Sequence, residues 1–265
     1  LELAPLEWYQ ENDIDLIVNE RVTDIHRDRK SITTSTDKEY HYDYLILATG
    51  SAPFVPPING IEKKGVFVYR TIEDLEGMLA YADEIKKNKP NCRAAVLGGG
   101  LLGLEAGKAV MDMGLEPHVV EYAPKLMPRQ LDSRSSNVLQ LTLEEMGIKI
   151  HTGKATNQIL GNGVITGMDF GEDDTLEVDM LVVSAGIRPR DELAKTCDLE
   201  MGVRGGIVVN EKMQTSALVV LEVSTKKRVN NILDEYVLQV LKKSDNVNQL
   251  LNQYLFSLEK IKKRL

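Results

Sequence analysis

The chain carries two kinds of apolar pattern, short continuous runs and stripes with helical spacing. The runs at 93–97, 118–121 and 180–183 predict buried strands, because strands covered on both faces are apolar throughout. The stripes predict helices over 72–85 and 101–113, since apolar residues recur there every three or four positions. Strands that alternate with helices along the chain predict an α/β fold with a parallel sheet.

Shorter patterns predict the remaining elements. Further helices are expected over 5–12 and from Asp132 to Gly147, and further strands over 14–18, 21–26, 31–36, 39–42, 42–48, 148–151, 155–160, 164–170, 176–178 and 207–210. Turn and cap residues mark where elements begin and end. They are Thr71 with Asp74 as a capping box, Gly114 after a helix, and Gly161-Asn162-Gly163 in a hairpin. The series predicts two α/β modules, one inserted in the other.

Three glycines follow the predicted strand at 93–97 with G-x-G-x-x-G spacing. Gly98 permits a tight strand-to-helix turn, Gly100 lets a pyrophosphate approach the backbone, and Gly103 lets the helix pack closely on the strand. The helix begins with Leu101 and Leu102, and this N-terminal end of the helix offers unpaired N–H groups to phosphates. The loop lies between a predicted strand and a predicted helix, as a dinucleotide-binding loop requires.

An acidic residue ends the next predicted strand. Glu121 lies about 20 residues after Gly98, the spacing at which a carboxylate accepts a hydrogen bond from a ribose 2′-OH. The alternative is a solvated strand end. Because a 2′-phosphate at this point would face like charge, NAD(H) is predicted in preference to NADP(H). Arg129 follows nearby and would offset part of that repulsion.

Two other strands end in small residues. Ala48, Thr49 and Gly50 follow one apolar run, and Ser184-Ala185-Gly186 follows another. Open α/β sheets bind ligands at the carboxyl ends of their strands, so both turns are candidates for lining a cofactor. The first turn alone is better explained as a tight connection without a ligand.

Charge is distributed unevenly over the 265 residues. The formal net charge is −8, but residues 217–265 contain nine Lys or Arg against five Asp or Glu, which leaves −12 for the remainder. An acidic main body argues against nucleic-acid binding. The basic end has helical periodicity over 229–265 and is expected either to pack as a helix or to meet a partner or anionic surface.

Cysteine and histidine usage limits the chemistry further. Cys92 and Cys197 form no C-x-x-C pair, which argues against a local redox dithiol and fits a reducing cytoplasm. The four histidines have no metal-ligand spacing, so no metal site is predicted. No apolar run reaches the ~20 residues of a membrane span, and no signal peptide is visible.

Several stretches together resemble a known family, namely 42–53, 67–75, 98–107, 119–132, 184–194 and 205–216. They are similar to the FAD- and NAD-dependent pyridine nucleotide-disulfide oxidoreductases. The wording of 126–132 (LMPRQLD) and 184–194 (SAGIRPRDELA) resembles the N-terminal flavoprotein portion of NAD(P)H-dependent nitrite reductase large subunits. Rubredoxin and ferredoxin reductases are near neighbours in the same superfamily.

The resemblance implies a domain plan. Residues 1–55 would be part of an FAD-binding domain, 56–186 a Rossmann-like NAD(P)-binding domain with a parallel sheet and a β-meander, and 187–216 the return to the FAD-binding domain. The basic segment 217–265 departs from the family. The family's first FAD-binding fold and its C-terminal flavin motif are missing, so the flavin site is expected to be incomplete in this chain.

The resemblance also implies functional roles. Ala48, Thr49 and Gly50 would lie beside FAD, the 98–103 loop would hold NAD(H), Gly186 would lie near the nicotinamide, and Glu105 would face that region. Glu105 is equally well explained as a carboxylate on the helix surface. Hydride passes between stacked rings in this family, so no side chain is assigned as catalytic.

The function implied is an NAD(P)H- and FAD-dependent oxidoreductase module of nitrate assimilation that passes electrons onward. Its partners would be a pyridine nucleotide and an electron-acceptor domain or protein, with a homodimer left open. Two alternatives remain at this point: a rubredoxin- or ferredoxin-reductase-like enzyme, and a non-catalytic nucleotide-binding remnant or partner module.

Overall fold

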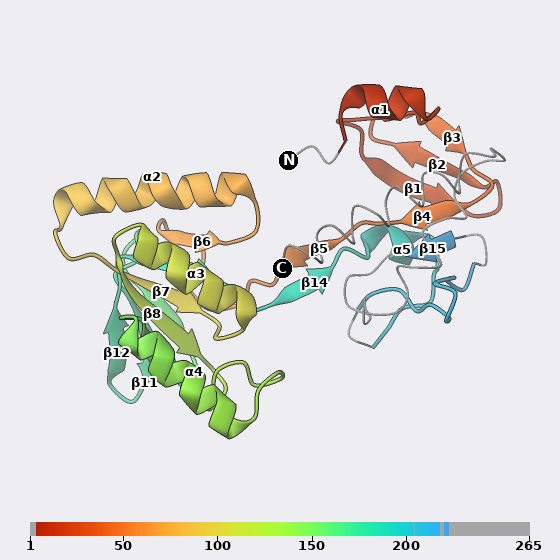
Figure 1. The fold of residues 1–265 in the computed structure, drawn as a ribbon. Coiled ribbons are helices and arrows are strands. Elements are labelled where there is room, and N and C mark those ends of the chain that lie inside the picture. Colours follow the sequence, from red (N-terminus) through yellow and green to blue (C-terminus); the bar gives the residue numbers. More distant parts are fainter. Residues whose placement is uncertain (1–3, 204, 218–219, 223–265) are drawn as a thin grey trace. The chain divides into compact units, whose positions relative to one another are not determined.

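A computed structural model describes residues 4–203, 205–217 and 220–222 (Figure 1). The chain divides into two compact units, an inner unit of residues 52–188 and an outer unit formed by residues 1–51 together with 189–265. The helical periodicity expected over 229–265 falls outside the described residues.

The inner unit is built on a five-stranded sheet. Every neighbouring pair of its strands is parallel. In order across the sheet, the strands are β6 (Val66–Val68), β13 (Met180–Val183), β7 (Arg93–Leu97), β8 (Glu116–Glu121) and β9 (Lys149–Thr152). The α/β fold class predicted from the alternation of strands and helices is therefore confirmed.

Helices cover one face of this sheet, and a second sheet covers the other (Figure 1). The helices are α2 (Ile72–Asn88), α3 (Leu101–Asp112) and α4 (Ser133–Glu145). The second sheet is antiparallel and contains β10 (Gln158–Leu160), β11 (Gly167–Gly171) and β12 (Asp174–Glu177). Double coverage explains why the central strands are continuously apolar.

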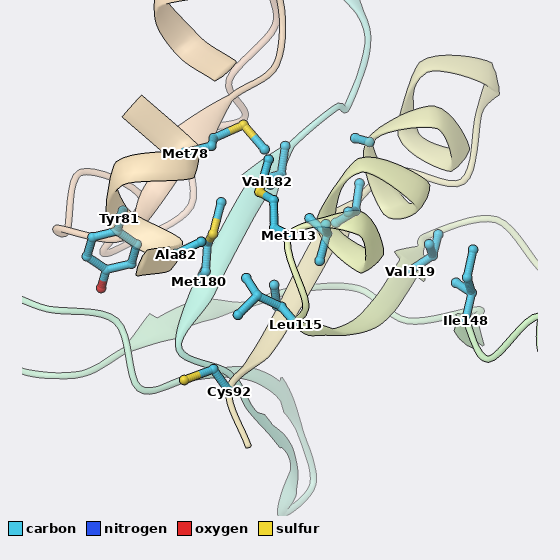
Figure 2. Close-up of a cluster of buried hydrophobic side chains, with 14 of the residues drawn as sticks. Met78, Tyr81, Ala82, Cys92, Met113, Leu115, Val119, Ile148, Met180 and Val182 are labelled. Carbon is cyan, nitrogen blue, oxygen red and sulfur yellow. The ribbon is translucent and has the colours of Figure 1, made fainter. Parts of the chain in front are cut away.

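The alternation of side chains along β7 creates two cores. Ala94 and Val96 join the cluster under the helices, where Val110 of α3 is also buried. Figure 2 shows Met78 of α2 in the same cluster. Their neighbours along the strand pack against the antiparallel sheet instead, because successive side chains point to opposite faces. The two cores lie on opposite faces of the sheet. Because its strands are all parallel, their carboxyl ends meet at a single edge.

The cap of α2 was correctly predicted. Thr71 Oγ1 accepts a hydrogen bond from the Asp74 N–H (3.2 Å), and the Thr71 N–H donates to Asp74 Oδ2 (2.8 Å). The helix runs to Asn88, with Lys86 and Lys87 in its last turn, where cations interact favourably with the helix dipole.

The outer unit is smaller. Its described residues form an antiparallel sheet β1–β2–β3, a parallel pair β4–β15, and two short helices. The bounds are α1 (Leu6–Glu11), β1 (Val22–His26), β2 (Ser31–Thr34), β3 (Glu39–His41), β4 (Leu45–Leu47), α5 (Glu192–Thr196) and β15 (Val220–Glu222). A two-stranded sheet pairs β5 (Ser51–Pro53) with β14 (Ile187–Pro189). Ile25, Leu47, Ala194 and Val220 form part of the core of the outer unit.

Several of the expected strands differ from the structure. Those expected over 155–160 and 164–170 begin three residues later, at Gln158 and Gly167. Residues 14–18 form no strand, and Leu16, Ile17 and Val18 are exposed. Residues 207–210 contribute only an isolated bridge between Met201 and Ile207, and the strand expected over 42–48 is limited to Leu45–Leu47. An apolar pattern does not make a strand unless a backbone partner lies beside it, and none of the described segments pairs with 14–18.

A histidine pair joins β8 to β9 on the face opposite the helices. The rings of His118 and His151 are stacked at 5.3 Å with 10° between their planes, and His118 Nδ1 lies 3.0 Å from His151 Nε2. His118 Nε2 also contacts Glu116 Oε1 at 2.9 Å, and Lys149 and Arg93 reach the same carboxylate. When His118 donates from Nε2 to Glu116, its Nδ1 can accept from His151 Nε2, an arrangement that requires a neutral His118 ring.

Mild acid is expected to destabilise the inner unit through this pair. Burial lowers the pKa of both rings, and for His151 the neighbouring His118 lowers it further. The unfolded chain then binds more protons below its ordinary His pKa of about 6.5, so the free energy of unfolding falls as the pH drops through that value. Urea midpoints at pH 7.5 and 5.5 test this expectation. A His151→Gln variant should show a smaller pH effect than the parent, and a His41→Gln variant should behave as the parent does.

Candidate functional site

A pocket of about 180 Å³ lies at the carboxyl edge of the inner sheet. Its lining comes from residues after β6, residues after β13 and the first turn of α3, with Pro53 beside them. Ligands bind at this edge in open α/β sheets. Since drug-sized ligands occupy about 300–1,000 Å³, the pocket has room for one part of a dinucleotide rather than all of it.

The three spaced glycines have different surroundings. Gly98 has φ +126°, and a Cβ there would overlap the Ser184 carbonyl oxygen. A Cβ on Gly103 would overlap the carbonyl oxygen of Gly98. Gly100 has ordinary extended angles, and a Cβ there would meet nothing within 4 Å. The fold of the loop therefore requires glycine at Gly98 and Gly103. At Gly100 the space for a Cβ is open, and this residue lines the pocket.

Leu101 and Leu102 begin α3 and also line the pocket. Their side chains are 66% and 42% exposed, which is unusual for leucines next to a buried sheet edge. An exposed apolar pair at a pocket mouth suits a ligand that covers it.

Glu121 braces the glycine loop. The Gly99 N–H donates to Glu121 Oε2 (2.6 Å), and the Ala123 N–H donates to Oε1 (2.7 Å). The Met127 N–H donates to the Gly99 carbonyl (2.9 Å), which ties the loop to the chain after β8. Each carboxylate oxygen has two lone pairs, so one acceptor position on each oxygen remains for a ligand.

Gly99 is a functional residue that the spaced motif does not reveal. A Cβ on Gly99 would lie 2.7 Å from Leu126 Cδ2 and 2.9 Å from Glu121 Cβ. Glycine therefore lets the loop approach the carboxylate closely enough to donate its N–H. The signal in the sequence was the unbroken run Gly98-Gly99-Gly100.

The end of β13 forms the wall opposite α3. The Ser184 N–H donates to the Leu97 carbonyl (2.9 Å), which holds the start of this turn against the strand before the glycine loop. Gly186 has φ +118°, which disfavours any side chain, and its carbonyl accepts from the Phe54 N–H (2.8 Å). Ser184, Gly186 and Ile187 all line the pocket.

Three charged candidates lie outside the pocket lining. Glu105 is exposed on α3, Arg129 is exposed in the loop after β8, and Glu121 lies behind the glycine loop. The charged residue that does line the pocket is Arg70, next to Tyr69. Neither Tyr69 nor Arg70 was predicted as a site residue from the sequence, although the two directly precede the capping box at Thr71.

In the outer unit, the turn at Ala48, Thr49 and Gly50 follows β4. Thr49 Oγ1 donates to the Arg190 carbonyl (2.6 Å), and the Arg190 N–H donates to the Gly50 carbonyl (3.0 Å). Gly50 has φ +68°, which explains the glycine. These contacts fix the turn from the returning chain.

Other chemistry finds little support within the described ranges. The described residues contain no cluster of three or more potential metal ligands. Burial raises the pKa of both the Cys92 and Cys197 thiols, so neither is primed as a nucleophile. None of the helices that could be searched is both long enough and apolar enough to cross a membrane.

The inner unit therefore has the architecture of a Rossmann-like dinucleotide-binding domain: a strand, a glycine loop, a helix and an acid that ends the next strand. The model of the pyridine nucleotide-disulphide oxidoreductase family matches residues 6–220. The chain belongs to this family, as the resemblance predicted.

Within this family, the chain is similar to nitrite reductases. The chain is 45% identical over 218 residues to the NADH nitrite reductase large subunit of Escherichia coli, an alignment that covers 82% of this chain and 25% of that protein. It is 42% identical over 215 residues to the NAD(P)H nitrite reductase of Bacillus subtilis, covering 81% and 26%. The chain thus spans about a quarter of the length of these relatives.

Solved structures agree with the sequence relatives. A ferredoxin reductase from Rhodopseudomonas palustris matches with a TM-score of 0.76 and 27% identity, over 84% of this chain and 53% of that one. A NAD-dependent persulfide reductase from A. fulgidus matches with a TM-score of 0.75 and 29% identity, covering 81% of this chain and 39% of that one.

Proposed function

We propose that the inner unit binds NADH and that the chain serves as the NADH-oxidising part of a nitrite-reductase-like flavoprotein. The observation that carries the proposal is the glycine loop, where Gly100 is open to the pocket while Glu121 fixes the loop from behind. The open position at Gly100 is a cradle that any side chain would fill, so these residues fit a pyrophosphate.

The strand order supports a direction for the nucleotide. The carboxyl ends of β8, β7 and β13 lie side by side, carrying Glu121, the glycine loop and Gly186 in that order. A dinucleotide laid along this edge places its adenosine ribose at Glu121, its pyrophosphate at the start of α3 and its nicotinamide near Gly186. Leu101 and Leu102 would then be covered by the ligand.

Glu121 favours NADH over NADPH in this arrangement. A free acceptor position on its carboxylate suits a ribose 2′-OH, whereas a 2′-phosphate would meet like charge. Arg129 is exposed on the following loop and would weaken that repulsion only in part. Glu105, one turn along α3 from the pocket, is proposed to lie toward the nicotinamide region.

The flavin part of the proposal rests on the outer unit. Ala48, Thr49 and Gly50 form a fixed turn of small residues at the end of a parallel strand, which suits close approach of FAD. FAD, when bound, supplies the acceptor for the hydride that NADH gives up. The role of this chain is to hold and orient the nucleotide, because hydride transfer depends on the alignment of the two rings.

The onward acceptor is proposed to be a nitrite-reducing domain or protein, and a rubredoxin- or ferredoxin-type acceptor is the alternative. Relatives in both groups share this module, including a rubredoxin-NAD(+) reductase of Pseudomonas putida at 30% identity. The cytoplasm is the proposed site of action, because it supplies NADH and keeps cysteines reduced.

Nucleotide titration of the full chain tests the proposal. NADH fluorescence should change in a saturable way in the micromolar range, and NADPH should bind more weakly. Calorimetry with the same samples checks the stoichiometry, which should be one nucleotide per chain. Lack of saturable binding by either nucleotide would show that the glycine loop does not function as a pyridine-nucleotide site.

A separate measurement tests the flavin part. If the purified chain is yellow, or if it stays yellow when it is mixed with FAD and then dialysed, it holds the flavin. NADH should then bleach the yellow colour. A chain that binds NADH but takes up no flavin would limit the function of this polypeptide to nucleotide binding.

A further inference from the structure

Arg70 gives the pocket a positive charge on the side away from the glycine loop. Among the described residues that line the pocket, Arg70 alone carries a charged side chain. The other lining residues are glycines, apolar side chains, Ser184 and Tyr69. Its guanidinium is therefore the charge within this lining, while the carboxylate of Glu105 lies on α3 outside it.

The backbone of Arg70 is held firmly. Its N–H donates to Asp74 Oδ2 (3.1 Å), the same carboxylate oxygen that accepts from Thr71 in the cap of α2. Tyr69, one residue earlier, packs against the core beneath the helices. The capping box and the core thus fix the chain on both sides of Arg70, which lines the pocket.

The strand order places Arg70 at the nicotinamide end of the proposed site. Arg70 follows β6, which pairs with β13, and β13 separates β6 from the glycine loop on β7. The pyrophosphate is expected at the glycine loop and the nicotinamide near Gly186, at the end of β13. Along this edge, Arg70 is the next residue beyond the nicotinamide position.

We propose that Arg70 makes the site select the reduced nucleotide over the oxidised one. This inference rests on the proposed function. The oxidised nicotinamide ring carries a positive charge and the dihydronicotinamide ring is neutral, whereas the adenosine and pyrophosphate are the same in both. A guanidinium beside the ring therefore disfavours NAD⁺ relative to NADH, which favours release of the product after hydride transfer.

Comparison of three ligands tests this role. The full chain and its Arg70→Met variant are titrated with NADH, NAD⁺ and ADP-ribose, which lacks the nicotinamide. The parent should bind NADH more tightly than NAD⁺. In the variant, the dissociation constant of NAD⁺ divided by that of NADH should fall by about threefold to tenfold, because NAD⁺ binds more tightly. This is the range expected for an exposed charge.

Matched variants separate charge from packing. Arg70→Lys keeps the charge and should keep most of the parent ratio. Arg134→Met removes an exposed arginine from α4 of the same unit and should leave all three affinities unchanged. The selectivity of the parent should also decrease with added salt, since ions screen an exposed charge.

The possible outcomes are distinct. If Arg70→Met weakens NADH, NAD⁺ and ADP-ribose by the same factor, Arg70 contacts the pyrophosphate and the inference is overturned. An unchanged ratio of NADH to NAD⁺ affinity overturns it as well. If the parent chain binds no NADH, the proposed function fails and this inference fails with it, whereas NADH binding with an unaltered ratio removes only the inference.

Discussion

Gly103→Ala is expected to destabilise the inner unit and to abolish nucleotide binding. The added Cβ would overlap the carbonyl oxygen of Gly98, so α3 must move away from the strand before it. Overpacking costs about 1–3 kcal/mol or more, and the better helix propensity of alanine returns roughly 1 kcal/mol. We therefore expect a net loss of up to about 2 kcal/mol or more, measured as a lower midpoint in urea, together with a distorted loop.

Gly100→Ala is the matched substitution, and it should separate binding from stability. Gly100 has φ −84° and ψ −177°, which alanine adopts readily, and its Cβ would meet no protein atom within 4 Å. The free energy of unfolding should change by less than about 1 kcal/mol, because the loss of a glycine N-cap is offset by a less flexible unfolded chain. NADH affinity should nevertheless fall about tenfold or more, because the methyl group fills the space proposed for the pyrophosphate.

Gly77→Ala serves as the control for both variants. Gly77 lies within α2, and an added Cβ would make only an ordinary contact of 3.8 Å with Phe67. The substitution should stabilise the inner unit by about 0.5–1 kcal/mol and leave NADH affinity unchanged. If Gly100→Ala binds NADH as tightly as Gly77→Ala does, the pyrophosphate does not lie at the glycine loop.

Local sequence signals predicted the parts of the fold that local interactions build. The strand, glycine loop and helix around Gly98 are adjacent in the chain, and the capping box of Thr71 and Asp74 spans a single turn. Each of these depends on backbone geometry within a few residues, so composition and spacing were sufficient.

The failures concern elements that depend on distant partners. The apolar run at 14–18 resembles a strand, but strand formation needs a second backbone beside it, and the sequence cannot supply that information. Arg70 was missed for a related reason. It follows β6, a strand of three residues, and its place in the pocket arises because β6 pairs with β13, more than a hundred residues later.

Glu121 illustrates a partial success. Its spacing from Gly98 indicated a ligand acid, whereas the structure adds that each of its oxygens accepts a backbone N–H. A carboxylate with two charged hydrogen bonds to the protein is also a structural residue. Any test of its binding role must therefore distinguish loss of the loop from loss of a ligand contact.

Glu121→Ala is expected to weaken NADH binding by about ten- to a hundredfold. The variant loses a charged acceptor for the ribose 2′-OH, worth roughly 1.5–3 kcal/mol, and leaves the N–H groups of Gly99 and Ala123 without their acceptor. Part of this loss should therefore appear as a lower urea midpoint of the apo chain. Equal NADH affinity in Glu121→Ala and the parent would falsify the assignment of Glu121 to the ribose.

The conservative variant tests the charge. Glu121→Gln keeps the shape of the side chain and removes the negative charge that opposes a 2′-phosphate, but its single oxygen can accept only one of the two backbone N–H groups that Glu121 holds. NADH binding should weaken modestly while NADPH binding strengthens, so the ratio of the two dissociation constants moves toward one. Glu145→Gln on α4 removes the same charge far along the chain and should leave this ratio unchanged. A ratio that stays constant in Glu121→Gln would mean that the carboxylate braces the loop at Gly99 without selecting the nucleotide, because bracing alone affects NADH and NADPH equally.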